Sequence, residues 1–248
     1  IKIVSTIHDM VFWDKKERFS KGIAYWDKIW SIYHSLKISD RIITVSNTSK
    51  QSIINYFPWA EEKIIVNYHG LHKPYGNLEI KFKKEKYFMF IGGRNSYKNY
   101  DLLLDSFSLV SKEFPDWKLI VVGENQKTYL KEQERYKALG ISELVIDYGL
   151  VSEEKLIELL QNASALVIPS LNEGFNFPLL EALAAGCPVL SSDIPVSKEI
   201  GIDYVTYFSN NTKSLVECMR NIISYQRKKE SLVKGQEYAR AFSWEKSF

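Results

Sequence analysis

The sequence has little cysteine and no long apolar run. Only two of its 248 residues are cysteines, Cys187 and Cys218. They are too few for a disulfide framework and lack the spacing of a metal site, so a reducing compartment is expected. No stretch approaches the ~18 consecutive apolar residues that a membrane helix needs. We therefore expect a cytoplasmic location, which includes the inner face of the cell membrane.

Several functional motifs are also absent. The 33 basic and 30 acidic residues give a net charge of +3 and form no run typical of a nucleic-acid-binding arm, so no nucleic acid is expected as a partner. The chain has no Walker loop, no Gly-x-Gly-x-x-Gly fingerprint and no Gly-x-Ser-x-Gly elbow, which argues against the usual NTPases, dinucleotide-dependent enzymes and hydrolases. It has no Asp-x-Asp pair and no histidines at metal-ligand spacing, so no metal or other cofactor is expected.

What the chain does contain is an alternation of apolar strands and amphipathic helices. Hydrophobic residues make up 45% of it, enough to bury the core of one or two domains. The pattern predicts an α/β fold with parallel strands covered by helices on both faces. In such folds ligands bind beyond the carboxyl ends of the strands. Strands are expected at 87–91, 118–122, 144–148, 165–168, 188–191 and 205–208.

A shorter version of the same pattern precedes residue 69. Residues 69–86 then combine glycines, a proline and lysines without periodicity, which is typical of a connection between domains. We predict a partial first domain over 1–75, a linker over 76–86, a second domain over 87–230 and a helical segment over 231–248 that crosses back to the first domain. Because residues 1–7 already read as a strand without a preceding Met, the front of the first domain is expected upstream.

Residues 172–186 are the most informative segment. Pro178 suits the first turn of a short helix, and Gly186 suits the left-handed position just past its end. The free N–H groups of this helix would face a ligand beside Gly174, which is a general way to hold phosphate. Glu173 precedes this glycine, where sugar hydroxyls could donate to it. Glu181 has a second explanation, because an acidic residue near a helix start also complements the helix dipole.

Two positive charges follow a Gly92-Gly93 turn at the end of the expected strand 87–91. Arg94 could grip phosphate oxygens through two parallel hydrogen bonds, and Lys98 could act on them as a point charge. Together they could neutralise a diphosphate leaving group. The alternative is that both are ordinary surface residues.

Two further features each allow two interpretations. His8 and Asp9 end the first strand, where His8 could orient a sugar hydroxyl, or Asp9 could simply cap a turn beside a partly buried histidine. Trp26, Trp30 and Tyr33 recur at helical spacing within 21–38. Such a stripe is typical of core packing, but it could also contact a lipid-linked acceptor or a membrane surface.

Taken together, these motifs resemble glycosyltransferase family 4 over nearly the whole chain. The sequence around these motifs is similar to that of the mannosyltransferase-like branch, which builds bacterial surface polysaccharides. The resemblance implies the GT-B fold, with two Rossmann-like doubly wound domains facing a cleft, the first of them incomplete here. It rests on Ile7-His8-Asp9, Gly92-Gly93-Arg94, Tyr97-Lys98-Asn99, Pro169-Ser170, the run from Glu173 to Pro178, Glu181 and Phe242-Ser243-Trp244-Glu245.

The resemblance implies a role for each motif. Arg94 and Lys98, beside Gly92 and Gly93, would bind the donor diphosphate. Glu173 would bind the hydroxyls of the donor sugar and Glu181 the ribose, while His8 would touch the sugar from the opposite domain. Loop residues Leu150 and Val151 would lie along the base. The backbone amides that would contact the sugar and phosphate belong to Gly174, Phe175, Asn176 and Phe177.

The implied activity is metal-independent sugar transfer with retention of configuration. The donor would be a nucleotide-diphosphate-sugar such as GDP-mannose or a UDP-sugar, and the acceptor a glycan or lipid-linked molecule of surface polysaccharide or lipopolysaccharide synthesis. In this family a phosphate oxygen is thought to take the acceptor proton, so no side-chain base is required. Two alternatives stay open: a GT-B sugar-nucleotide epimerase or hydrolase, and a non-catalytic nucleotide-sugar-binding subunit that activates a partner.

Overall fold

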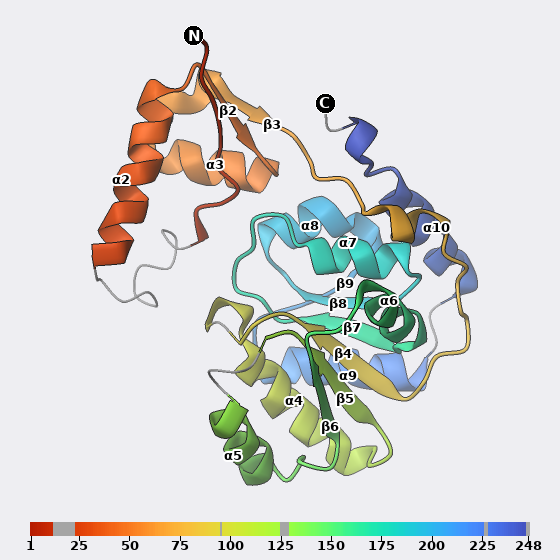
Figure 1. Cartoon of the computed structure of the whole chain (residues 1–248). Coiled ribbons are helices and arrows are strands. Elements are labelled where there is room, and N and C mark those ends of the chain that lie inside the picture. The colour runs from red at the N-terminus through yellow and green to blue at the C-terminus, as the bar shows by residue number, and fades with distance from the viewer. Residues whose placement is uncertain (12–22, 95, 125–128, 226–227, 247–248) are drawn as a thin grey trace.

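The computed structural model describes residues 1–11, 23–94, 96–124, 129–225 and 228–246 (Figure 1). They form two parallel β-sheets with strand orders β1-β2-β3 and β6-β5-β4-β7-β8-β9. The smaller sheet consists of β1 (Val4–Thr6), β2 (Arg41–Thr44) and β3 (Ile64–Val66). The larger consists of β4 (Tyr87–Ile91), β5 (Lys118–Val122), β6 (Val145–Gly149), β7 (Ala165–Ile168), β8 (Val189–Ser192) and β9 (Thr206–Phe208). The predicted α/β class with parallel strands is confirmed.

The helices follow the expected alternation, with one addition. They are α2 (Ile23–Ile38), α3 (Asn47–Tyr56), α4 (Tyr100–Glu113), α5 (Tyr129–Leu139), α6 (Glu153–Asn162), α7 (Phe177–Ala184), α8 (Pro195–Gly201), α9 (Thr212–Ser224) and α10 (Lys229–Arg240). Sequence reasoning missed α8, because seven residues are too few to show a helical period. Its one sequence signal was Pro195 in the first turn, a position that proline favours.

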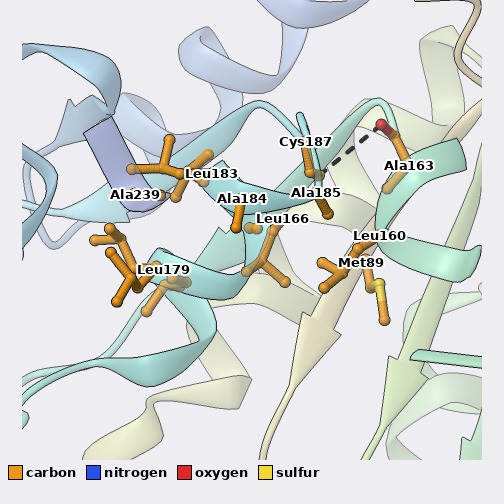
Figure 2. Close-up of a cluster of buried hydrophobic side chains, with 14 of the residues drawn as sticks. Met89, Leu160, Ala163, Leu166, Leu179, Leu183, Ala184, Ala185, Cys187 and Ala239 are labelled. Atoms are coloured by element: carbon orange, nitrogen blue, oxygen red, sulfur yellow. Dashed lines mark hydrogen bonds between the residues drawn. The ribbon is translucent and has the colours of Figure 1, made fainter. Parts of the chain in front are cut away.

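Helices cover both faces of the larger sheet, because successive side chains of a strand point to opposite faces. Phe88 and Phe90 of β4 pack into a core with α4 and α9. Met89 of the same strand packs on the other side with α6, α7 and α10. Figure 2 shows this second core, in which Cys187 is 1% exposed. Burial on both faces explains why β4 reads as a continuous apolar run.

The strand order locates the point where a ligand is expected. From β4 the chain adds β5 and β6 on one side, and then returns to add β7, β8 and β9 on the other. The order therefore reverses between β4 and β7, and in open parallel sheets the crevice at such a reversal binds ligands. The loops that leave β4 and β7 contain the predicted motifs around Lys98 and Glu173.

At two glycines the backbone lies too close to another segment for a larger residue to fit. Gly123 has a φ of +134°, and a Cβ there would lie 2.4 Å from the Gly92 carbonyl oxygen, so only glycine lets the ends of β4 and β5 approach this closely. A Cβ on Gly70 would lie 2.2 Å from the Trp244 nitrogen, and the Leu71 N–H donates to the Phe242 carbonyl at 2.9 Å. Residues 242–244 thus lie directly against residues 70–71.

Within the part of the chain that the structure describes, none of the helices combines the length and the apolar character needed to cross a membrane. The aromatic stripe of α2 is not core. Trp26 and Trp30 are 63% and 66% exposed, and Tyr33 is 42% exposed. The Trp30 ring stacks on His34, with centroids 5.0 Å apart.

Candidate functional site

The reversal of strand order brings two of the predicted residues together. Lys98 ends a short 3₁₀ helix after β4, and Glu173 lies in the loop after β7. The Lys98 ammonium donates to the Glu173 Oε1 at 2.6 Å across 75 positions of sequence. The Ser170 hydroxyl donates to the same oxygen at 2.7 Å. The two loops thus form one polar site at the crevice.

This ion pair is mostly but not fully buried. The side chains of Lys98 and Glu173 are 13% and 10% exposed. The Lys98 methylenes run past Gly92, where a Cβ would lie 3.5 Å from the Lys98 Cε. An ammonium group carries three donors that rotate freely, so Lys98 can exchange its partner for another anion without moving its backbone. The pair can therefore open toward a ligand that offers a phosphate and hydroxyls.

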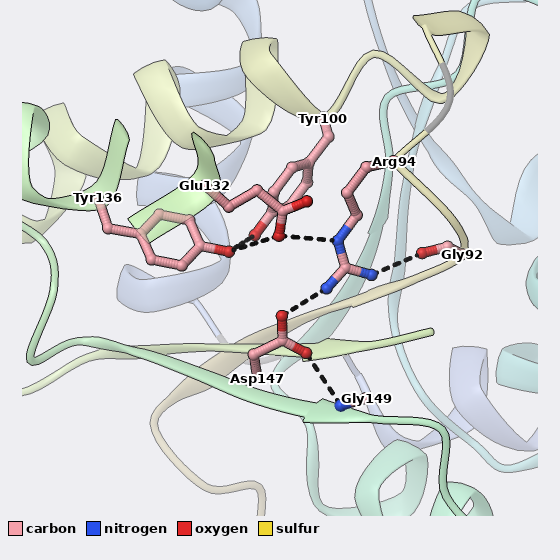
Figure 3. Close-up of polar contacts among 7 residues, drawn as sticks. All are labelled: Gly92, Arg94, Tyr100, Glu132, Tyr136, Asp147 and Gly149. Carbon is pink, nitrogen blue, oxygen red and sulfur yellow. Dashed lines mark hydrogen bonds and ion pairs between the residues drawn. The ribbon is translucent and has the colours of Figure 1, made fainter. Parts of the chain in front are cut away.

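Arg94 is placed differently from the prediction (Figure 3). Its side chain is 3% exposed and each of its three nitrogens has an acceptor. Nη2 donates to Asp147 at 2.6 Å, Nε to Glu132 at 3.3 Å and Nη1 to the Gly92 carbonyl at 2.9 Å. Two carboxylates already neutralise this guanidinium. Arg94 is therefore paired within the protein, and its contact with a donor diphosphate stays a prediction.

The surroundings of Arg94 keep it charged. Burial alone would lower the pKa of Arg94, but the neighbouring carboxylates of Asp147 and Glu132 raise it above its ordinary value. The Asp147 Oδ1 accepts the Gly149 N–H at 2.9 Å, and the Tyr136 hydroxyl donates to Glu132 at 3.3 Å. The network thus ties the loop after β4 to β6 and α5, and we call these residues the Arg94 network: Gly92, Arg94, Glu132, Tyr136, Asp147 and Gly149.

The short helix α7 begins and ends as the sequence indicates. Pro178 lies in its first turn, and Gly186 has a φ of +66°. The residue before the helix, Asn176, also has a left-handed φ of +70° and is 3% exposed. Its amide nitrogen donates to the Ser197 hydroxyl at 3.1 Å. Its Oδ1 has no hydrogen-bond partner among the described residues.

Residues of the smaller sheet and its helix α3 touch the Gly174 turn. The Gly174 carbonyl accepts the hydroxyls of Ser46 at 2.7 Å and Ser49 at 3.2 Å. A Cβ on Gly174 would lie 2.9 Å from the Asp9 Cβ and 3.2 Å from the His8 carbonyl oxygen. Glycine is therefore required for the close approach of the His8-Asp9 segment. The pattern of residues 46–49 indicates a helix start, but it predicted no contact of either serine with this turn.

The side chains around this turn form an aromatic cluster. The His69 ring stacks on Phe177 at 4.7 Å and meets Phe175 edge-on at 5.1 Å. The exposed His8 ring stacks on the other side of His69 at 5.6 Å. Burial, and then the nearby His8, lower the pKa of His69. The rings of Phe175 and Phe177 thus pack against other side chains of the protein.

The remaining predicted residues lie along α7 and after β6. Glu181 lies on α7, where burial raises the pKa of its carboxyl group, with His72 opposing the shift and Glu153 adding to it. The buried hydroxyl of Tyr75 has no hydrogen-bond partner among the described residues. Leu150 is 79% exposed, and Val151 is half-buried against the core formed with α6 and α7. Residues that sequence reasoning missed include Glu132, Asp147 and Glu199, whose partners are far away in sequence.

No metal-binding cluster is present in the described ranges, where no three or more of the His, Cys, Asp and Glu side chains are grouped to hold a metal ion.

The family model and the similar proteins all point to glycosyl transferases. Residues 78–243 match the family described as Glycosyl transferases group 1. The O-antigen chain mannosyltransferase RfbU of Salmonella typhimurium is 33% identical over 190 residues, which are 76% of this chain and 52% of that protein. The O-antigen chain mannosyltransferase B of Escherichia coli is 26% identical over 262 residues, covering 98% of this chain and 67% of that protein. The chain thus spans about half to two thirds of the length of these relatives.

A solved structure shares the fold. Anabaena Alr3699/HepE in complex with UDP and glucose superposes with a TM-score of 0.78 at 17% identity, covering 98% of this chain and 67% of that one. The loops that meet at the reversal of strand order, with Lys98 and Glu173, lie within the matched residues. The chain belongs to the family of group 1 glycosyl transferases.

Proposed function

We propose that this chain forms the donor-binding part of a retaining glycosyltransferase of GT-B architecture. The enzyme would transfer a hexose from a nucleotide-diphosphate-sugar to a glycan or lipid-linked acceptor in bacterial surface polysaccharide synthesis, without a metal. The observation that carries the proposal is the Lys98–Glu173 pair at the reversal of strand order. Two of the relatives are named O-antigen mannosyltransferases, and the Anabaena structure holds UDP and glucose, which supports a nucleotide-sugar donor.

The chemistry assigns Lys98 to the leaving group. When the bond between the sugar C1 and the diphosphate oxygen breaks, negative charge grows on the diphosphate and positive charge on the sugar. A fixed cation accelerates this step where the charge grows. The acceptor oxygen bonds to C1 on the face that the diphosphate leaves, and its proton passes to a diphosphate oxygen. No side-chain base is needed, so Glu173 is assigned to the sugar hydroxyls as an orienting group.

The other predicted residues surround this centre in the proposal. Arg94 acts through the Gly92 carbonyl, and so holds the Gly92-Gly93 turn in place for the diphosphate. The backbone of residues 174–177 faces the sugar and phosphate, and the partly desolvated Glu181 accepts the ribose hydroxyls. Leu150 and Val151 border the base. The exposed His8 reaches the sugar from the side of the smaller sheet.

The exposed aromatic stripe of α2 supports the acceptor side of the proposal. Aromatic rings at this exposure suit a membrane interface or a lipid-linked molecule, because one edge can lie in an apolar layer while the other stays hydrated. A peripheral position at the inner face of the cell membrane would bring the enzyme to such an acceptor.

The test replaces the charged pair in the full-length protein. Lys98→Ala is expected to lower the transfer rate about 10²- to 10³-fold, the usual loss when one preorganised group at developing charge is removed. Glu173→Gln should also lower it. Lys86→Ala, an exposed lysine paired with Asp116 at the other end of β4, is the matched control and should retain activity. The assay measures acceptor-dependent release of nucleoside diphosphate from GDP-mannose, UDP-glucose and ADP-glucose.

Each alternative has its own outcome. Unchanged turnover in both Lys98→Ala and Glu173→Gln would contradict the assignment of this pair to the donor site. Product formed without any acceptor would indicate an epimerase or hydrolase. Calorimetric binding of a nucleotide-sugar without turnover would indicate a binding subunit. An anomeric NMR spectrum of the product decides between retention and inversion.

A further inference from the structure

Glu199 of α8 binds the start of α3, the helix that connects β2 and β3 of the smaller sheet. Its Oε1 accepts the Asn47 N–H at 2.6 Å and the Tyr68 hydroxyl at 2.8 Å. Its Oε2 accepts the N–H of Thr48 at 2.8 Å and the hydroxyl of Thr48 at 2.6 Å. Asn47 and Thr48 are the first two residues of α3, about 150 positions earlier in the chain. One carboxylate thus takes four hydrogen bonds across the junction of the two sheets.

This arrangement completes the cap of α3. The first N–H groups of a helix have no partner within it, and the positive end of the helix dipole lies there. Ser46 satisfies the Ser49 N–H, and Glu199 satisfies the N–H groups of Asn47 and Thr48. Removing Glu199 would leave two donors of α3 and the Tyr68 hydroxyl without this acceptor.

The protonation states favour the contact at neutral pH. Burial alone would raise the pKa of Glu199, but the hydrogen bonds from Thr48, Asn47 and Tyr68 lower it below its ordinary value. Burial, followed by Glu199, raises the pKa of Tyr68 to about 12. The carboxylate is therefore ionised and the tyrosine keeps its proton.

The same elements hold the turn that contains Glu173 from two sides. Ser46 and Ser49, at the start of α3, bind the carbonyl of Gly174. On the other side Ser197, two residues before Glu199 on α8, binds the Asn176 amide. Each of the three parts therefore contacts the other two. Glu199 of α8 binds α3, Ser46 and Ser49 bind the turn, and the Asn176 amide of the turn binds Ser197 of α8.

We propose that Glu199 is a positioning residue for the donor sugar. By holding the start of α3 it keeps Ser46 and Ser49 on the Gly174 carbonyl, and this fixes residues 173–176 in the conformation that receives the sugar. Glu199 acts through the turn and does not touch the donor. The assignment rests on the proposed function of that turn as half of a donor site.

A first experiment measures the turn without any ligand. Amide hydrogen exchange on the full-length protein compares Glu199→Gln with Glu217→Gln, an exposed glutamate of α9 that serves as the matched control. Exchange at residues 173–177 is expected to become about tenfold faster in Glu199→Gln, the scale of one lost hydrogen bond to a charged group. Exchange in β4 and β5 should stay unchanged.

A second, milder pair of variants guards against misfolding. Thr48→Val removes one hydroxyl bond to Glu199 and should speed exchange at the turn in the same direction, while Thr48→Ser keeps that bond and should restore protection. Faster exchange confined to residues 47–49 would show a local cap only and would overturn the proposal. Uniformly faster exchange over the whole chain in Thr48→Val would overturn it as well.

A kinetic readout links the turn to the reaction. With whichever nucleotide-sugar the enzyme uses, Glu199→Gln should raise the donor KM about tenfold and leave kcat within about twofold, because the binding-competent turn becomes a minor conformer. An unchanged donor KM would contradict the proposal. If the wild-type protein transfers no sugar, the proposed function fails, while hydrogen exchange still decides whether Glu199 orders the turn.

Discussion

Two cations follow the same strand and meet opposite environments. Arg94 turns toward β6 and α5, where it is 3% exposed and faces two carboxylates. Lys98, four residues later, turns toward the loop after β7, where it faces one carboxylate. The strand order reverses between these two sides of β4. The difference shows that two neighbouring charges need not share their partners, because their side chains turn to different sides of β4.

The comparison also separates two uses of charge. The Arg94 network joins an arginine to two carboxylates and a backbone carbonyl, and one of the carboxylates also accepts a tyrosine hydroxyl, so the charge of the arginine is paired within the protein. The Lys98–Glu173 pair has fewer partners and keeps part of its surface. The first arrangement suits a fixed support, and the second suits exchange with a ligand.

The largest expected effect comes from breaking the Arg94 network. Arg94→Met should lower the free energy of unfolding by about 3–5 kcal/mol, because it leaves two mostly buried carboxylates without their cation. Urea denaturation measures the change. The matched control is Arg135→Met on α5, whose side chain is 41% exposed in its pair with Asp105; the loss there should be about 1 kcal/mol or less.

If Arg94→Met and Arg135→Met lose similar stability, the network is not a structural support and the contrast between the two cations disappears.

A smaller stability change is expected at the other cation. Lys98→Met should cost about 1–3 kcal/mol, because among the described residues the Glu173 carboxylate then keeps only its hydrogen bond from Ser170. Adding Glu173→Gln should restore part of this loss, since no unpaired carboxylate remains. Urea denaturation of the wild type, both single variants and the double variant gives the coupling energy. Independent, additive effects of the two substitutions would count against a coupled pair.

The smallest effect concerns the partly buried carboxylate of Glu181. Burial raises the pKa of Glu181, so the folded state holds its proton more tightly than the unfolded chain. Stability from this group is complete below its ordinary pKa of 4.5 and is lost as pH rises through the raised value. Glu181→Gln should therefore be more stable than wild type at pH 7 and equal to it near pH 4.

Thermal unfolding at both pH values measures this difference, and Glu217→Gln, at an exposed position of α9, is the control that should show none. A Glu181→Gln variant that is less stable than wild type at pH 7 would mean that the carboxylate is satisfied by partners in the folded state. The same variant should bind nucleotide more weakly if Glu181 accepts the ribose hydroxyls.

Much of the fold and part of the site could be read from the sequence. The strands over 87–91 and 118–122 were predicted to the residue, because each is a clear apolar run bounded by turn residues. The sequence placed Lys98 and Glu173 after strands of one parallel sheet, but it did not predict the hydrogen bond between them. The domain boundaries and the ligand roles of the site residues stay predictions.

What could not be read depends on side-chain direction and distant pairing. The sequence shows Arg94 after a strand but not which side of β4 it turns to, since Glu132 and Asp147 come from elements whose relative placement needs the folded sheet. The contact of Glu199 with α3 joins segments about 150 positions apart, and α8 itself was too short to recognise.

The order of strands also bears on how the chain acquires its structure. Phe88 of β4 pairs with Leu119 of β5, and also with Ala165 of β7, which is more than twice as far along the chain. Closing the longer loop costs more entropy, and non-local pairings slow folding. The Arg94 network lies entirely within residues 92–149 and can be complete before β7 is in place. Loop length thus favours formation of the Arg94 network before the Lys98–Glu173 pair, which needs the loop after β7.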